Sequence, residues 1–349
     1  MASLIGIEIG GTKLQLVAGD AAGRIADRRR LDVAKARGGA GIRDQIAHAL
    51  PELIATHQAT AIGVGFGGPV DHEIGRIAKS HQIEGWSEFE LCEWLHEQTG
   101  LPVRVDNDAN VAALGEALAG AGKGLNPVFY VTLGSGVGGG LVVDGRIYHG
   151  AKPGESEIGH VRLDKSGVIV EQRCSGWAVD RRIREAIKHE PDSQLAQLAG
   201  KSHRRENRLL IHRSSANTAT GAAALAAESG SGATKAALPN EVPAAGGEAR
   251  FLKPALEAGD ALARRILDET AEDLAFALSH VVQLMHPAAI ILGGGLSLVG
   301  EPLREAVARQ LRRFIMEVFG AGPTVQLAAL GEDAVPVGAL LLAATTTPP

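Results

Sequence analysis

One short polar segment, Val105–Asn110, carries side chains well suited to proton transfer. It reads V-D-N-D-A-N and places two aspartates, Asp106 and Asp108, on either side of Asn107. An apolar run precedes the segment and an alanine- and leucine-rich stretch of near-helical period follows it, so a strand ends and a helix begins here. Ligand sites of α/β sheets usually lie at such positions. The helix dipole predicts that Asp108 is ionised at neutral pH and can serve as a general base.

The same turn has a simpler interpretation, in which Asp106 or Asp108 only caps the helix. Considered alone, the turn favours this interpretation at least as much as a catalytic one. The glycine-rich turns elsewhere in the chain are needed to decide between them.

Two glycine-rich turns interrupt strand-like segments. Gly10–Lys13 separates two apolar runs near the N-terminus, and Gly134–Gly140 separates two others. Each turn is followed by an Asp/Gly turn and an Arg-Ile pair, which predicts a duplicated α/β domain. Two such lobes would leave a central cleft between them, with both glycine turns facing it.

Backbone N–H groups of glycine turns can converge on phosphate oxygens. The first turn also offers the ammonium group of Lys13, and the second offers the hydroxyl of Ser135. Gly134–Gly139 and Gly63–Gly68 both match G-x-G-x-x-G, but neither opens a helix, which argues against a dinucleotide-binding fold. One glycine loop is best explained as a tight turn. Two matching loops together with Gly293–Gly295 favour phosphate binding.

The composition limits the class of protein. The 349 residues suggest two domains, and 45% hydrophobic residues are enough for a full core. A net charge of −5 without a long Lys/Arg run gives no support for a nucleic-acid partner. The N-terminus lacks the basic region of a signal peptide, and no apolar run is long enough to span a bilayer. The two cysteines, Cys92 and Cys174, form neither a disulfide framework nor a zinc set, which fits the cytoplasm.

Hydrophobic periodicity predicts the remaining elements. Among them are a short strand at Val161–Leu163 and one long helix at about Phe251–Met285, ended by His286-Pro287. From about Gly200 to Arg250 the periodicity is lost, and we expect a mobile segment or the flank of a lid. The other predicted helices lie at about 41–56, 88–99, 175–189, 301–314 and 334–344, and the other strands at about 24–27, 61–66, 288–292 and 324–328.

Taken together, these residues resemble the ROK family of sugar kinases and related repressors over nearly the whole chain, most weakly over about 190–250. The order of the motifs makes the match specific, although no single motif is. In chain order, they are Glu8–Lys13 (family pattern D-x-G-G-T), Gly68–Asp71 (G-P-x-D), Asn107–Asn110 (N-D-A-N), Thr132–Gly140 (second phosphate loop), Glu157–His160 (E-I-G-H) and Gly293–Gly295 (adenosine side).

The resemblance implies a two-lobed actin-like, ribonuclease-H-like fold that closes over sugar and ATP. It implies a small N-terminal α/β lobe of residues 1–116, joined by a returning helix at about 334–345, and a larger lobe of residues 117–333. The implied activity is ATP- and magnesium-dependent phosphorylation of a hexose in the cytoplasm, with glucose as the first candidate. No nucleic acid or membrane partner is implied, whereas a homodimer or larger homo-oligomer is.

The resemblance also assigns site residues. Asp108 is the implied catalytic base, and Glu8 stands where a magnesium ligand is expected. The implied sugar-binding residues are Gly68, Asn107, Asp108, Glu157, His160 and Glu171. The implied ATP-binding residues are Gly10, Gly11, Thr12, Lys13, Gly134, Ser135, Gly136, Gly138, Gly294 and Gly295.

Three departures from the family pattern matter. Glu8 replaces the usual aspartate, and its longer side chain changes the geometry near the γ-phosphate. The family's C-x-C-G-x-x-G-C-x-E zinc motif has lost its cysteines: Glu171 falls at its final Glu, and Cys174 alone cannot hold zinc, so we predict no zinc. No helix-turn-helix segment precedes Leu4, which argues against a repressor.

Several alternatives stay open. The sugar could be fructose, mannose, allose or an N-acetylated hexosamine instead of glucose. The protein could also be a sugar-binding regulator that has lost catalysis, for which Glu8 would be the first cause to test. An actin-like filament or chaperone ATPase has less support, because the sugar-binding acids would have no role in it.

Overall fold

The computed structural model describes residues 3–11, 13–78, 84–151, 156–200 and 246–346. The chain forms two compact units, one comprising residues 1–178 and 267–349 and the other residues 179–266. Most of the segment expected to be mobile, 201–245, lies outside the described residues.

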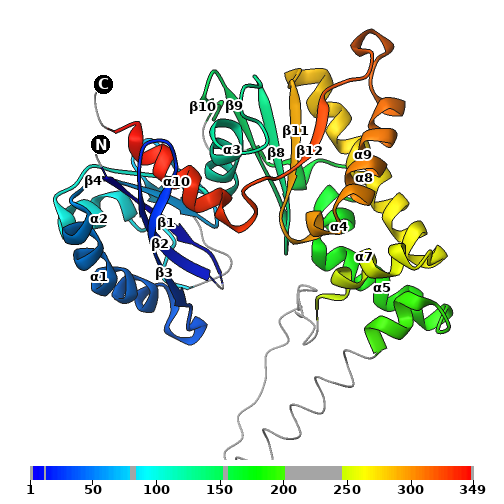
Figure 1. Ribbon diagram of the computed structural model, residues 1–349, viewed down its shortest axis with the longest axis horizontal. Coiled ribbons are helices and arrows are strands. Elements are labelled where there is room, and N and C mark those ends of the chain that lie inside the picture. Colours follow the sequence, from blue (N-terminus) through cyan, green and yellow to red (C-terminus); the bar gives the residue numbers. More distant parts are fainter. Residues whose placement is uncertain (1–2, 12, 79–83, 152–155, 201–245, 347–349) are drawn as a thin grey trace, which may run out of the picture. The chain divides into compact units, whose positions relative to one another are not determined.

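The first unit contains two five-stranded sheets that share one topology (Figure 1). In each sheet, the first three strands in the chain pair in turn as antiparallel neighbours. The fourth strand pairs in parallel with the first, and the fifth pairs in parallel with the fourth. This confirms the predicted duplication. The first sheet has the order β3(Ile25–Asp32)-β2(Lys13–Gly19)-β1(Ser3–Ile9)-β4(Ala59–Phe66)-β7(Val103–Asn107). The second has the order β10(Arg146–Ile147)-β9(Val137–Val143)-β8(Val128–Leu133)-β11(Ala289–Gly293)-β12(Thr324–Leu327).

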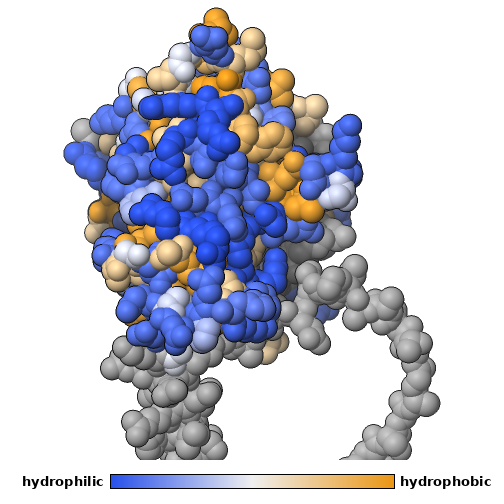
Figure 2. Space-filling view, turned by 90° about the vertical axis from the view of Figure 1, so that its right-hand side faces the viewer, coloured by the Kyte–Doolittle hydropathy of each residue, from blue (hydrophilic) through white to orange (hydrophobic). Residues whose placement is uncertain are grey.

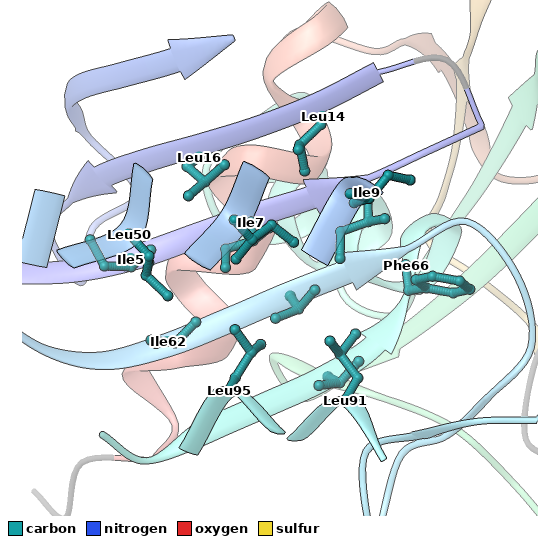
Figure 3. Packing of buried hydrophobic residues seen from close by; sticks show 14 of the residues in the cluster. Ile5, Ile7, Ile9, Leu14, Leu16, Leu50, Ile62, Phe66, Leu91 and Leu95 are labelled. Atoms are coloured by element: carbon teal, nitrogen blue, oxygen red, sulfur yellow. The ribbon is translucent and has the colours of Figure 1, made fainter. Parts of the chain in front are cut away.

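The core of the first sheet is built almost entirely from aliphatic side chains (Figure 3). Helix α1 (Gly38–His57) buries Ile42, Ile46, Leu50 and Leu53, which recur at helical spacing on one face. Helix α2 (Leu91–Thr99) adds two leucines to the same core. The short strands β5 (Val70–Asp71) and β6 (Arg76–Ile77) form a separate two-stranded sheet between β4 and α2 in the chain.

The last helix, α10 (Ala334–Ala344), packs on α3 (Asp108–Leu118) and on strands β1 and β4 (Figure 1). The backbones approach very closely, because a Cβ atom at Gly338 would overlap the carbonyl of Val111. A glycine is therefore required at this contact.

Further helices are α4 (Val170–Cys174), α5 (Gly176–His189), α7 (Leu252–Glu257), α8 (Ala261–Met285) and α9 (Glu301–Phe314), and residues 194–200 are also helical. The single long helix predicted over 251–285 is wrong: Gly259 adopts a φ of +76°, and Asp260 starts a new helix by accepting the N–H of Ala263 at 2.7 Å. The strand predicted at Val161–Leu163 is also wrong, since only an isolated bridge between Arg162 and Ile169 forms. Short 3-10 turns lie at Lys35–Arg37, Ile158–His160, Glu248–Phe251, Gly295–Val299, Glu317–Phe319 and Gly331–Asp333.

The molecular face in Figure 2 is mainly hydrophilic, with hydrophobic residues in separate patches. Within the described ranges, no helix combines the length and the apolar character needed to cross a membrane.

Candidate active site

The polar residues in the turn between β7 and α3 make different contacts. Asn107 caps the helix, because its Oδ1 accepts the N–H groups of Ala109 at 2.8 Å and Asn110 at 3.4 Å. Its Nδ2 donates to the carbonyl of Gly68 at 3.1 Å, which joins this turn to the segment after β4. The interpretation of Asp106 or Asp108 as the cap is therefore wrong.

Asp108 is partly exposed but closely surrounded by protein. A Cβ atom at Gly67 would lie 3.3 Å from Asp108 Oδ2, so the carboxylate fits against the end of β4. Burial, and to a lesser extent the negative charge of Glu8, raise the pKa of Asp108 to about 7. Asp108 was expected to be ionised at neutral pH, and a pKa of about 7 leaves the carboxyl only partly ionised there, because burial disfavours its charged form.

Glu8 lies near the end of β1, directly opposite Gln15 on β2. Gln15 is buried and donates through Nε2 to Glu8 Oε2 at 2.6 Å, and Lys13 Nζ lies 3.5 Å from the same oxygen. Gln15 Oε1 accepts from Arg28 and Arg30, which fixes the orientation of the Gln15 amide. Burial raises the pKa of Glu8, and Lys13 opposes that rise.

The first glycine turn lies beside Asp108. Its Gly10 N–H donates to the carbonyl of Lys13 at 2.8 Å, and Gly67 N–H donates to the carbonyl of Ile9, also at 2.8 Å. Because Gly67 also faces the Asp108 carboxylate, the first glycine turn and the N-D-A-N turn (Asn107–Asn110) lie together. Gly11 is described within this turn, whereas Thr12 lies outside the described residues.

The second glycine turn also contacts the N-D-A-N turn. A Cβ atom at Gly138 would be 3.2 Å from the Cβ of Ala109, the residue that follows Asp108. Within the turn, Gly134 N–H donates to the carbonyl of Gly136 at 3.0 Å. Ser135 lies between these two glycines.

The third glycine run meets the second turn at the end of β8. Gly293 pairs with Thr132 across the parallel strands β11 and β8. Gly294 has a φ of +80°, and a Cβ atom there would lie 2.6 Å from backbone atoms of Leu133. Gly294 thus lies against Leu133, the residue that directly precedes Gly134. A role of Gly294 and Gly295 in nucleotide binding stays a prediction.

Glu171 contacts the second turn directly. Its Oε2 accepts the N–H of Val137 at 2.9 Å, and a Cβ atom at Gly136 would overlap the same oxygen. The chain is held there because Gly176 N–H donates to the carbonyl of Gly134 at 2.7 Å. The carboxylate predicted to bind sugar therefore lies against the predicted phosphate loop.

The E-I-G-H segment packs against the same strand. A Cβ atom at Gly159 would overlap the carbonyl of Val137, whose N–H is bound by Glu171. Glu157 and His160 are exposed and hydrogen-bonded to each other, with 3.2 Å between Oε2 and Nδ1. Their side chains are accessible to a ligand, and their role in sugar binding stays a prediction.

Two polar residues beside the predicted site, Gln15 and His149, were not among the predicted site residues. Gln15 could have been found, since it lies opposite Glu8 in a predicted hairpin. His149 approaches Asp106 from a distant segment, with 2.6 Å between His149 Nε2 and Asp106 Oδ2, and no local pattern indicates this contact.

Among the side chains that the structure describes, no group of three or more His, Cys, Asp or Glu residues is arranged to hold a metal ion. The Cys174 thiol is buried and lies 3.7 Å from the carbonyl of Thr270. The absence of zinc stays a prediction.

Comparison with known proteins identifies the family. The model of the ROK family matches residues 4–346. A glucokinase of Halalkalibacterium halodurans is 32% identical, over 96% of this chain and 92% of that protein.

Solved structures agree. The ROK family glucokinase of Streptomyces griseus, in complex with glucose and AMPPNP, superimposes with a TM-score of 0.74 at 28% identity, covering 99% of this chain and 100% of that one. The ROK hexokinase of Thermus thermophilus gives a TM-score of 0.72 at 26% identity, covering 99% and 98%. The fold is the two-domain actin-like ATPase fold of these enzymes. The chain therefore belongs to the ROK family and is one of its ATP-dependent sugar kinases.

Proposed function

We propose that the protein transfers the γ-phosphoryl group of ATP to the 6-hydroxyl of glucose, with Asp108 as the general base. The observation that carries this proposal is the position of Asp108, with Gly67 against its carboxylate and Gly138 against the next residue. Its pKa of about 7 supports the role, because a general base works best when its pKa lies near the operating pH.

The chemistry requires a base because a sugar hydroxyl is a weak nucleophile. Asp108 would accept the hydroxyl proton as the oxygen attacks the γ-phosphorus. Asn107 supports this step by capping the helix in place of Asp108, so that the Asp108 carboxylate is available to the substrate. Burial, and to a lesser extent the charge of Glu8, raise the pKa of Asp108 in the protein without metal and thereby make its carboxylate a stronger base.

The glycine turns would bind the phosphates. Their backbone N–H groups can donate to phosphate oxygens, and Lys13 adds a positive charge to the first turn. Glu8 is chemically suited to a magnesium ion, because magnesium prefers carboxylate oxygens. Its contacts to Gln15 and Lys13 both use Oε2, so we assign Oε1 to the metal side. Bound magnesium would neutralise developing phosphate charge.

The sugar would be held by Asn107, Glu157, His160 and Glu171, together with the backbone of Gly68. Carboxylate and imidazole groups suit a sugar, since they can accept or donate hydrogen bonds to several hydroxyls at once. For Glu171 the contact with Val137 uses Oε2, which leaves Oε1 for a hydroxyl.

Glucose is proposed because the relative at 32% identity and the structural neighbour at 28% identity are both glucokinases. Fructose, mannose, allose and N-acetylated hexosamines are the alternatives within the same chemistry. A regulator without turnover is the alternative outside it, and the replacement of Asp by Glu8 is the feature that favours it.

The test is ADP release from Mg-ATP with each hexose in turn, for the parent protein and for Asp108→Asn. We expect release with glucose above the other sugars, and loss of at least about a hundredfold in kcat in the variant. Sugar binding by the variant, measured calorimetrically, should stay within about threefold of the parent.

Each other result contradicts a named part of the proposal. A preference for another hexose would correct the substrate, and near-normal turnover by Asp108→Asn would remove Asp108 from the base role. Sugar-dependent thermal stabilisation without turnover would indicate a regulator, and Glu8→Asp would then be tested for restored activity.

A further inference from the structure

A second polar cluster lies directly behind the catalytic turn. Asp106 has a side chain only 4% exposed. Its Oδ1 accepts the N–H of Asn107 at 2.8 Å and the Nδ2 of Asn110 at 3.0 Å. Its Oδ2 lies 2.6 Å from Nε2 of His149, whose side chain is 19% exposed. These contacts join the carboxylate to the N-D-A-N turn on one side and to His149 on the other.

His149 is the donor in the last contact. A carboxylate accepts hydrogen bonds, so the proton lies on Nε2 of His149. The ring of His149 is also held on its face, because it stacks on His72 with 3.5 Å between ring centroids and an interplanar angle of 3°. Donor and stacking partner together define both the position and the tilt of the imidazole.

The cluster joins three segments that each carry proposed substrate groups. Asp106 and Asn110 stand two residues before and two residues after Asp108. His72 follows the Gly68–Asp71 segment, and His149 comes shortly before the E-I-G-H segment. A shift of His149 would therefore reach the turn that carries Asp108 through Asp106, and the segment after Gly68–Asp71 through His72.

The state of His72 fits this arrangement. Burial, and the adjacent His149, lower the pKa of His72, whereas the negative charges of Asp106, Glu73 and Asp71 oppose that change. His72 is accordingly neutral at pH 7, and the stacked rings do not carry two positive charges.

We propose that His149 is a positioning residue: its hydrogen bond to Asp106, backed by the ring of His72, sets the catalytic turn relative to the sugar-binding segments. Asp108 accepts the proton, and His149 fixes the position of the turn that carries Asp108 through its contact with Asp106. The kinetic part of this inference rests on the proposed function.

The experiment separates the hydrogen bond from the stacking. His149→Phe keeps a flat ring against His72 but removes the donor, and His149→Gln restores a donor without the ring. His57→Phe is the matched control, because His57 Nε2 also contacts an aspartate, Asp27, at 3.2 Å, and the His57 side chain is about as buried as that of His149. For each variant kcat, KM for sugar, KM for ATP and the unfolding temperature are measured.

We expect His149→Phe to lower kcat by about tenfold or more while KM for ATP stays within about twofold, since the base is misaligned but the phosphate turns are not. His149→Gln should recover at least about a third of the parent kcat, and His57→Phe should leave kcat unchanged. A kcat within about twofold of the parent for folded His149→Phe, or no recovery in His149→Gln, would overturn the proposal.

Failure of the proposed function is distinguishable from failure of this inference. If the parent turns over no hexose, the inference is judged by NMR of protein labelled in its histidine rings. A slowly exchanging Nε2 proton that disappears in His149→Phe, shifts in Asp106→Asn and responds to added glucose supports it. The inference is overturned if the ring N–H proton of His149 exchanges freely with water. It is also overturned if the resonance of this proton shifts neither in Asp106→Asn nor on addition of glucose.

Discussion

Three adjacent polar residues between β7 and α3, Asp106, Asn107 and Asp108, have three different surroundings. Asp106 is buried among hydrogen-bond donors, Asn107 caps α3, and Asp108 lies partly exposed between the glycine turns. The sequence showed that chemistry is concentrated here, because the residue types and the strand-to-helix transition are local features. The division of tasks depends on which way each side chain points at the end of β7, and local pattern does not encode that.

The raised pKa of Asp108 predicts a cost in stability. A carboxylic acid whose pKa is higher in the folded than in the unfolded state binds more protons when folded, so stability falls as the pH rises from about 4 to about 7 and is constant above. Asp108→Asn removes the loss of stability that ionisation of Asp108 causes, because a neutral amide resembles the protonated acid. We expect the variant to gain on the order of 1–3 kcal/mol over the parent at about pH 8, and much less at about pH 5.

Urea unfolding of both proteins at the two pH values measures this difference. An advantage of Asp108→Asn that is equal at both pH values would contradict the raised pKa. A variant less stable than the parent at the higher pH would show that the ionised carboxylate has a stabilising partner instead.

At the scale of elements, most strands and helices were predictable, but one break between helices was not. The strand predicted at about 288–292 is observed at Ala289–Gly293, because its apolar content and the glycines that end it are strong signals. The break between α7 and α8 was missed, since Gly259 and Asp260 interrupt an apolar pattern that continues in helical period on both sides. A left-handed residue of this kind is set by tertiary packing, which periodicity does not report.

The close contact between α3 and α10 predicts that no side chain larger than that of glycine fits at position 338. In Gly338→Ala the added methyl would overlap the Val111 carbonyl, a backbone atom that cannot turn aside. We expect a loss of about 3 kcal/mol or more in the free energy of unfolding, measured with urea. Gly200→Ala is the control, because nothing lies within 4 Å of a Cβ atom there, and its stability should be unchanged or slightly raised. A tolerated Gly338→Ala would mean that the two helices can separate without cost.

At the scale of the whole molecule, the ordered set of motifs predicted the family and the fold. The glycine turns and the N-D-A-N turn meet because the sheets end there, so chain order and sheet topology suffice to bring them together. The stacking of His72 on His149 had no such signal, since the two histidines lie on separate segments and neither belongs to a regular element. The choice among hexoses likewise depends on distances between side chains and hydroxyls, not on their order in the chain.

The loss of the family's cysteines predicts how the protein responds to metal removal. EDTA should abolish turnover, magnesium should restore it, and the unfolding temperature without substrate should not change, because metal is required for phosphate transfer and not for folding. Elemental analysis of the purified protein should find far less than one zinc per chain. One tightly bound zinc whose removal lowers the unfolding temperature would contradict this expectation.

The return of α10 to the first sheet has a consequence for how the protein is made. Leu4 and Val17, near the beginning of the chain, share a buried cluster with Leu340 and Ala343, near its end. A ribosome that adds about 5–20 residues per second therefore completes β1 and β2 roughly 15–60 s before it supplies the helix that covers them. During that interval one apolar face of the first sheet has no α10 to bury it, and the nascent chain must be kept from aggregating until its last helix is released.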